Sequence, residues 1–226
     1  YSFSLFPLMD YTGRPDYVVD CLIHGRFVIM IEGSPIAIIG PGNLTLLFKT
    51  PEDLYLPFYF VSLKRLFRIF GVGVALFFPG FWIALSAFNP DQIPFPLLAT
   101  VTIARTGLPL PTPLEAFVMV GLFEFFREAG ERLPKSIGQV VAVVGGIIIG
   151  DAAIRAGIVS TTMLVMAAVT AVATFTLVNQ SLSGSVSLIR LFVMLMASFL
   201  GMYGFILSII AIVLYLASLE SFGVPY

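Results

Sequence analysis

The stretch IFGVGVALFFPGFWIALSAF, residues 69–88, decides the fold of this chain. Its 20 residues carry no charge. An α-helix rises about 1.5 Å per residue, so this stretch as a helix is about 30 Å long, the thickness of the hydrocarbon core of a bilayer. It therefore predicts a membrane-spanning helix. Lys64, Arg65 and Arg68 come just before it, and this basic group predicts that the helix begins on the cytoplasmic side.

The composition of the whole chain agrees with lipid as its solvent. The chain has 226 residues, of which 58% are hydrophobic and 11% charged, and its mean hydropathy is +1.01. Soluble domains carry about 25% charged residues, because a surface in water must be polar. The formal net charge of −1 gives no reason to expect nucleic acid as a partner. The expected partner is the lipid bilayer.

Residues 1–60 have the character of a soluble segment. Arg14-Pro15-Asp16 predicts the start of a helix that runs to about Ile23. Two β-type runs, residues 26–32 and 36–39, are joined by Gly33-Ser34-Pro35, which is typical of a hairpin. We interpret residues 1–60 as the C-terminal part of a cytoplasmic α+β domain with a linker. We also expect the chain to be a piece of a longer protein.

Residues 61–226 are predicted to form a transmembrane helical domain. Further apolar runs at 137–156, 158–178 and 191–219 give a mainly α, polytopic bundle of about four to six membrane segments, with a tilt or kink in the last run at Gly201 and Gly204. Residues 89–113 hold six prolines, too many for a regular spanning helix. An exposed loop remains open, but the apolar LLATVTIA within this segment favours a re-entrant or interfacial segment.

Charged residues gather near the end of the helix that is predicted to begin at Thr112. There, Thr112 and Glu115 have the spacing of a capping box, so we assign Glu115 to capping. Farther along, Glu124, Arg127, Glu128 and Glu131 share one face. One interpretation is an interfacial helix end with Glu124–Arg127, Arg127–Glu131 and Glu128–Arg132 pairs. The other is a stripe facing a water-filled conduit, with Glu124 deepest.

Two further groups could contribute to a pore or to coupling. Asp151 and Arg155 are four residues apart, which predicts an ion pair near the headgroups or, alternatively, a charge at a pore mouth. Thr162, Thr170 and Thr174 share a helix face. Threonine hydroxyls usually bond back to their own helix, so pore lining is the less favoured interpretation of this face.

Small residues recur at every fourth position at Gly138, Ala142, Gly146 and Gly150, which predicts close packing against another helix. The single Cys (Cys21) and single His (His24) exclude a disulfide framework and a Cys/His zinc cluster. Sequence motifs of hydrolases, P-loop proteins and dinucleotide-binding proteins are absent. We therefore expect no enzyme activity, no cofactor and no metal.

Three blocks of this sequence resemble a known family. They are EFFREAGERLPKSIGQVVAVVGGIIIGDAAIRAGIVS (124–160), RPDYVVDCLIHGRFVIMIEGSPIAIIGP (14–41) and SFGVPY (221–226). Together they closely resemble the A subunit of GerA-type spore germinant receptors. The chain departs from the family at Asp151, where Gln is frequent, and at Asn179–Ser183, where the family usually reads SYxLS.

The resemblance implies a multi-pass subunit in the inner membrane of bacterial spores. It implies a homo-oligomer, suspected to be a pentamer, that encloses a nutrient-gated channel for cations. It also implies two partners, a permease-like B subunit that binds the nutrient and a lipoprotein C subunit. The alternatives are a non-conducting signalling or scaffold subunit and the related SpoVA-associated accessory subunit. A secondary transporter is disfavoured, because the sequence has no internal repeat.

Overall fold

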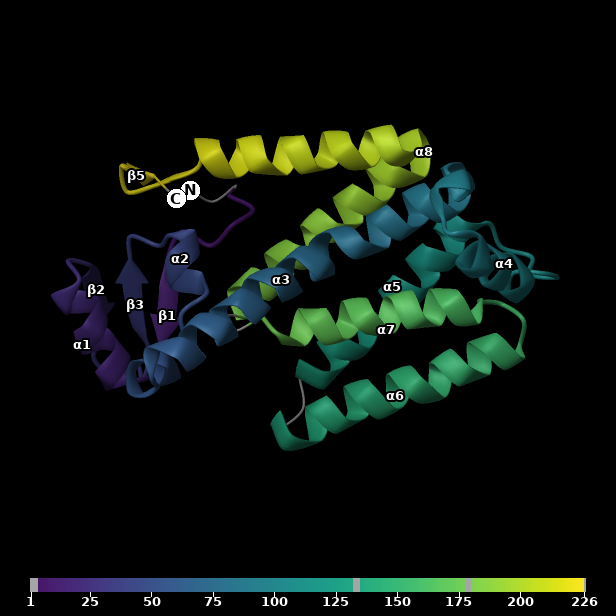
Figure 1. The fold of residues 1–226 in the computed structure, drawn as a ribbon. Coiled ribbons are helices and arrows are strands. Elements are labelled where there is room, and N and C mark those ends of the chain that lie inside the picture. The colour runs from purple at the N-terminus through teal and green to yellow at the C-terminus, as the bar shows by residue number, and fades with distance from the viewer. Residues whose placement is uncertain (1–3, 132–134, 178–179, 226) are drawn as a thin grey trace. The chain divides into compact units, whose positions relative to one another are not determined.

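A computed structural model describes residues 4–131, 135–177 and 180–225 (Figure 1). The chain is mainly helical, with a small β segment near the N-terminus, as the sequence predicts. Contacts divide it into two compact units. The first unit comprises Tyr1–Val72, Phe175–Val186 and Ile210–Tyr226, and the second comprises Gly73–Thr174 and Ser187–Ile209.

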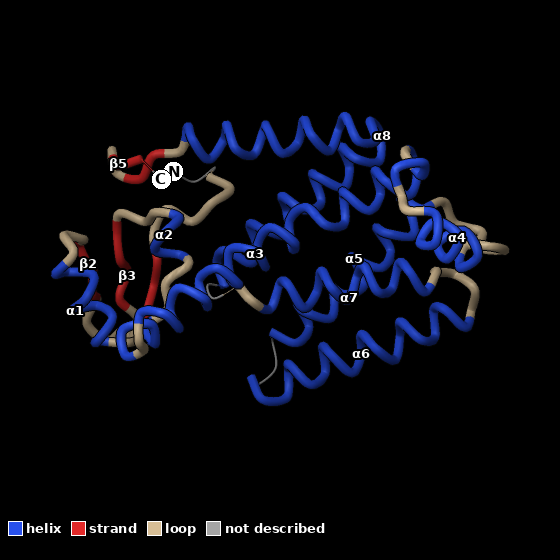
Figure 2. Tube along the Cα trace, viewed as in Figure 1, coloured by secondary structure: helices blue, strands red, loops and turns tan. Residues whose placement is uncertain are grey.

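The first unit begins with a helix on a small antiparallel sheet (Figure 2). The strands pair in the order β1-β3-β2. The elements are β1 (Asp10–Thr12), α1 (Pro15–Ile23), β2 (Phe27–Met30) and β3 (Ala37–Gly40). The predicted helix and the predicted β2–β3 hairpin are both confirmed. The sequence does not predict β1, because three residues are too few to display an alternating pattern.

The core of this sheet and helix is a cluster of Tyr17, Cys21, Ile39 and Leu46. Cys21 is only 2% exposed, and burial raises the pKa of its thiol. This environment is typical of a packing cysteine rather than of a reactive one.

Two short helices connect the sheet to the long helix α3. They are α2 (Leu44–Leu47) and the 3-10 helix η1 (Pro51–Tyr55). Asn43 caps α2, since its side chain accepts a hydrogen bond from the Leu46 amide. Helix α3 (Phe58–Ile83) continues into a π-helical turn over Ala84–Phe88, so the three basic residues that were predicted to precede the first span lie within its helix.

Asp53 connects η1 to α3. Both nitrogens of the Arg68 fork donate to its carboxylate, at 2.9 and 3.2 Å, and the Thr50 hydroxyl donates at 2.8 Å. The Asp53 side chain is 4% exposed. Burial alone raises the pKa of this carboxyl, but the hydrogen bonds from Arg68 and Thr50 outweigh burial and lower its pKa from 3.8 to about 2. Asp53 is therefore ionised at neutral pH, and its bonds to Arg68 anchor the start of α3.

The C-terminal residues return to the first unit as a two-stranded hairpin, β4 (Glu220–Ser221) and β5 (Val224–Pro225). Phe222 and Gly223 form its turn with φ angles of 53° and 78°, the positive values that a tight hairpin turn requires. The Ser221 hydroxyl donates to the Leu8 carbonyl at 2.8 Å, and the Leu5 amide donates to the Tyr215 hydroxyl at 3.0 Å. The C-terminal hairpin is thus bonded to Leu8, and the end of α8 is bonded to Leu5.

The second unit is helical. It contains the last part of α3 and the middle of α8 together with four further helices. These are α4 (Phe95–Ala104), α5 (Thr112–Glu131), α6 (Lys135–Arg155) and α7 (Thr161–Phe175), with a short 3-10 helix, η3 (Pro90–Gln92), before them. Helix α4 has ten residues and is therefore about 15 Å long, half of a membrane crossing.

Helix α8 (Gln180–Ser218) turns back on itself at Gly201, where φ is 61° and ψ is −138°, a backbone region open essentially to glycine alone. A Cβ built at Gly204 would contact the Met196 carbonyl, although residues eight apart in a straight helix are about 12 Å apart. Figure 2 shows this reversal. The single last span that the sequence predicts is thus two helical arms, and the bend expected at Gly201 is a full reversal.

Both arms of α8 lie against α3 within the second unit. On the first arm, a Cβ at Gly80 would lie 2.6 Å from Val193 Cγ1, so glycine permits a close approach of the two helices. On the second arm, the rings of Phe81 and Phe205 have centroids 5.5 Å apart. These contacts hold the reversal against the end of α3.

Two helices in the described part of the chain are long and apolar enough to cross a membrane, judged by length and composition. They are Phe58–Phe88 and Leu182–Ser218, and Phe95–Ala104 and Thr161–Phe175 are shorter apolar helices. The second of the long helices contains the Gly201 reversal.

Candidate functional site

A cluster of charged side chains lies among the apolar helices of the second unit. Helix α5 supplies Glu124 and Arg127, the first arm of α8 supplies Ser187 and Arg190, and α7 supplies Thr174. Glu124 and Arg127 are neighbours because residues three apart on a helix lie on the same face. Ser187 and Arg190 share a face of α8 for the same reason.

Every oxygen of the Glu124 carboxylate has a donor. One oxygen accepts from Arg127 and, at 2.5 Å, from the Ser187 hydroxyl, and the other accepts from Arg190. Arg127 also donates to Ser187 at 3.0 Å. The second terminal nitrogen of Arg190 donates to the Thr174 hydroxyl at 3.2 Å. One carboxylate therefore connects α5 to α8, and Arg190 extends the network to α7.

The Glu124 carboxylate pairs with two guanidinium groups, those of Arg127 and Arg190. The Arg190 side chain is 4% exposed and that of Arg127 is 17% exposed. Buried charges are costly unless they are paired, so the Glu124 carboxylate compensates both cations. This cluster, Glu124–Arg127–Ser187–Arg190, is called the charge cluster below.

The sequence identifies Glu124 and Arg127 as a pair but misses Ser187 and Arg190. A signal for them exists: Ser183, Ser187 and Arg190 recur at the spacing of one helix face within an otherwise apolar run. Glu128 is exposed on α5. The predicted Arg127–Glu131 and Glu128–Arg132 pairs lie outside the described residues, because the side chain of Glu131 and all of Arg132 are not described.

The threonine face of α7 is mostly buried. The hydroxyls of Thr170 and Thr174 each donate to the carbonyl four residues earlier, at 2.9 and 2.8 Å. Thr174 also accepts from Arg190, which makes it part of the network around the charge cluster. Thr162 lies at the other end of the helix, with its hydroxyl 3.2 Å from that of Ser160.

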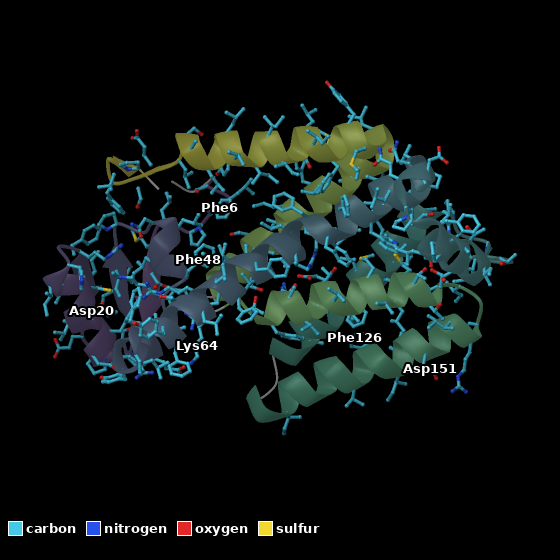
Figure 3. All side chains as sticks on the ribbon, in the orientation of Figure 1. Phe6, Asp20, Phe48, Lys64, Phe126 and Asp151 are labelled. Atoms are coloured by element: carbon cyan, nitrogen blue, oxygen red, sulfur yellow. The ribbon has the colours of Figure 1, made fainter. Side chains whose placement is uncertain are left out.

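Asp151 and Arg155 form an ion pair near the end of α6, with Arg155 Nε 2.9 Å from an Asp151 oxygen. Their side chains are 57% and 79% exposed, and Figure 3 shows Asp151 on the outside of α6. This pair is separate from the charge cluster.

The glycines of α6 lie at close helix contacts. A Cβ at Gly138 would contact the Gly130 carbonyl of α5, and one at Gly146 would lie 2.7 Å from Phe123 Cε1. A Cβ at Gly150 would lie 2.6 Å from Leu164 Cδ1 of α7. Phe126, labelled in Figure 3, packs over Gly145 in the same α5–α6 contact. The side chain of Ala142 lies outside the described residues.

The assignment of Glu115 to a capping box of its own helix is wrong. Its carboxylate accepts instead from the backbone amide of Ser160, the residue before α7. Glu115 is 0% exposed, and its other oxygen lies 3.8 Å from Arg105 Nε. The error arises because a carboxylate at the first turn of one helix can cap a neighbouring helix equally well, and sequence spacing cannot distinguish the two.

The described residues include no group of three or more His, Cys, Asp and Glu side chains placed to hold a metal ion. The chemistry of the charge cluster is that of an ionic bridge between helices in which both oxygens of the Glu124 carboxylate accept hydrogen bonds. Such a bridge can hold two helices in one arrangement and can release them when its charges are separated.

Comparison with known proteins identifies relatives along the whole chain. "Spore germination protein XA" of Bacillus anthracis is 53% identical over 225 residues, which are 100% of this chain and 46% of that protein. "Uncharacterized membrane protein YfkQ" and "Spore germination protein KA", both of Bacillus subtilis (strain 168), are each 39% identical over 100% of this chain, covering 44% and 41% of their own lengths. The chain thus spans less than half of each relative.

No solved structure matches the chain. The sequence profile described as "Bacillus/Clostridium GerA spore germination protein" matches residues 1–226. A match over every residue, together with relatives at 53% and 39% identity, confirms the resemblance found in the sequence. The chain therefore belongs to the GerA spore germination protein family.

Proposed function

We propose that this chain is part of a membrane subunit of a nutrient germinant receptor in bacterial spores, and that the subunit forms an oligomeric, nutrient-gated path for cations. Membership of the GerA family supports the role in germination. The observation that carries the ion path is the charge cluster: ionisable groups among apolar helices are costly, and in membranes they usually mark ion pathways or the elements that control them.

The proposed location is the spore inner membrane, with residues 1–60 in the cytoplasm and residues 61–226 forming the helical membrane domain. The permease-like B subunit and the lipoprotein C subunit are the proposed partners, and a homo-oligomer, with a pentamer as the working number, is the proposed assembly. The subunit is proposed to act without catalysing a reaction. The residues 89–113 are proposed to be re-entrant, which the half-length helix α4 supports.

The membrane domain is proposed to cross the bilayer an even number of times. The support is that the C-terminal hairpin and residues 5–8 are hydrogen-bonded in one unit, so both belong on one side of the membrane. Of the four to six segments that the sequence predicts, this favours four or six over five. The reversal of α8 at Gly201 supplies the additional crossing, because the two arms run in opposite directions.

Cysteine labelling tests this topology. In a Cys21→Ser background, single cysteines at the exposed positions Glu52, Asp91 and Glu220 are treated with a membrane-impermeant maleimide in sealed vesicles. E52C and E220C are expected to react from the same side and D91C from the other. Reaction of E220C together with D91C would contradict an even number of crossings.

Several residues remain proposed contributors to the path or to its coupling with nutrient binding. They are Glu124, Arg127, Glu128, Asp151, Arg155, Thr162, Thr170 and Thr174. Glu124 is the strongest of them, since it is the acidic group of the charge cluster. Thr170 and Thr174 face protein rather than lipid, with exposures of 2% and 6%.

Single-channel recording of the full-length protein with its partner subunits in planar bilayers tests the function. Nutrient is expected to evoke cation currents, and E124A is expected to change conductance or selectivity, because it removes the carboxylate and leaves two arginines. A D91A variant, which removes an exposed carboxylate that is not among the proposed contributors, is the matched control. A complex that triggers germination but carries no current would favour a non-conducting signalling subunit.

A further inference from the structure

The role of Arg190 follows from the hydrogen bonds that the two oxygens of the Glu124 carboxylate accept. A carboxylate that lines a cation path must present an oxygen to the ion, and both oxygens of Glu124 are occupied. Arg127 and Ser187 bind one oxygen and Arg190 binds the other. In the arrangement described here, a cation would have to compete with two guanidinium groups for the Glu124 carboxylate.

Arg190 differs from Arg127 in what its bond to Glu124 connects. Arg127 lies three residues from Glu124 on the same helix, so their ion pair cannot hold two helices together. Arg190 lies 66 residues away on α8, and its ion pair bridges α5 and α8. Its other terminal nitrogen bonds Thr174 of α7. Of the two arginines, Arg190 is therefore the one whose removal breaks the ion pair between α5 and α8.

The two members of the bridge differ in what their loss would cost. Removing Glu124 would take the carboxylate away from Arg190, whose side chain is 4% exposed, which is strongly unfavourable. Removing the charge of Arg190 leaves Glu124 paired with Arg127. The fold is therefore expected to tolerate the loss of Arg190 better than the loss of Glu124.

We infer that Arg190 is a positioning residue that holds the Glu124 carboxylate in an α5–α8 bridge, so that Glu124 becomes available to cations only when α8 moves away from α5. The inference rests on the proposed function and names the residue that controls access to the ion path. The first arm of α8 is the moving element, because it carries both Ser187 and Arg190.

K+ efflux in the absence of nutrient tests the inference. Full-length protein with its partner subunits is placed in sealed, K+-loaded vesicles. R190Q is expected to raise the resting efflux by about 5–150-fold, the range of a typical coupling between a bound group and a conformational equilibrium. R190K, which keeps the charge, is expected to stay near the wild-type rate. R127Q makes the same charge change without breaking the bridge and is expected to raise efflux less than R190Q.

A charge swap tests whether Arg190 acts through the α5–α8 bridge. The double variant E124R/R190E restores an α5–α8 ion pair, so its unfolding temperature in detergent is expected to exceed that of R190Q; its efflux is not compared, because the swap removes the Glu124 carboxylate. A resting efflux at the wild-type rate in R190Q, with the protein folded, would overturn the inference, as would a swap that unfolds at the temperature of R190Q. If R190Q does not accumulate in the membrane, the swap alone decides, since a swap that folds supports the bridge and a swap that also fails to accumulate refutes it.

Failure of the inference and failure of the proposed function give different results. A closed R190Q in a complex that still conducts with nutrient refutes only the role of Arg190. A wild-type complex that never carries current refutes the ion path itself. Thermal unfolding of the same variants in detergent reports whether the bridge exists, independently of any current.

Discussion

Asp151 and Arg155 lie four residues apart on α6, with side chains that are 57% and 79% exposed, whereas Glu124 and Arg190 lie 66 residues apart on two helices, with side chains that are 29% and 4% exposed. The first pair can exchange each partner for water or for a lipid headgroup. The second pair cannot, because Arg190 has almost no access to solvent. Two ion pairs of the same chemistry are thus expected to differ in how far their removal lowers the free energy of unfolding.

The Asp53–Arg68 pair is intermediate between them. Its side chains are 4% and 13% exposed, and its partners lie 15 residues apart in the first unit. In addition to Asp53, Arg68 bonds the Phe48 carbonyl at 2.9 Å and the Thr50 hydroxyl at 3.1 Å. Loss of Asp53 therefore leaves Arg68 with two other acceptors. Arg190 has one other acceptor among the described residues, the Thr174 hydroxyl. Among the three acidic residues, the comparison predicts that substitution lowers the free energy of unfolding most at Glu124, less at Asp53 and least at Asp151.

The largest effect is expected from E124A. It leaves two largely buried arginines without their carboxylate and should lower the free energy of unfolding by about 3–5 kcal/mol, the usual cost of breaking a buried pair. Thermal unfolding of the full-length protein in detergent measures it. D91A, which removes an exposed carboxylate, is the control. A loss equal to that of D91A would mean that the charge cluster does not stabilise the fold.

The next effect is expected from G201A, which acts on the reversal that orients the first arm of α8. An alanine at φ 61° and ψ −138° is strained by about 1–3 kcal/mol, and its Cβ would lie 2.9 Å from Phe88 Cγ. G121A, in α5 with no atom within 4 Å of the added Cβ, is the control and should be neutral or slightly stabilising. Equal unfolding temperatures for both variants would argue against a sharp reversal.

D53N is expected to cost about 1.5–3 kcal/mol at neutral pH, the range for hydrogen bonds to a charged group. The pKa of Asp53 is lowered to about 2, so its contribution is complete above about pH 4 and is lost as the pH falls through 2. Unfolding of wild type and D53N between about pH 5 and pH 2 measures this. The two curves should converge toward the acid end, and curves that stay parallel would contradict the low pKa.

The smallest effect is expected from D151A. An exposed pair within one helix contributes about 0.2–1 kcal/mol, and salt weakens it further. Unfolding at low and high ionic strength checks both points. A cost as large as that of D53N would contradict an exposed pair at Asp151.

Sequence spacing predicts pairs within one helix and misses pairs between helices. The Glu124–Arg127 and Asp151–Arg155 pairs follow from spacings of three and four residues, because the helix itself brings such residues together. Arg190 meets Glu124 only through the packing of α8 on α5, a contact that no local pattern encodes. The same reason explains Glu115, whose partner Ser160 lies 45 residues away.

The same distinction applies to the fold: features with a local sequence signal are predicted, and features set by packing are not. The helix at Pro15–Ile23 and the β2–β3 hairpin have local signals in Pro15 and Gly33-Ser34-Pro35, and the sequence places both well. The reversal of α8 has only Gly201 as its signal, and a glycine in an apolar helix is equally compatible with a mild kink. Backbone dihedrals, not composition, distinguish the two.

The hydrogen bond from Ser221 to Leu8 joins residues 213 positions apart, and this has a consequence for biosynthesis. At about 5–20 residues per second, Ser221 leaves the ribosome roughly 10–40 s after Leu8. Residues 5–8 therefore lack these partners while the residues between them are synthesised. A chain that stalls in this interval leaves an unfinished surface that chaperones and proteases can recognise.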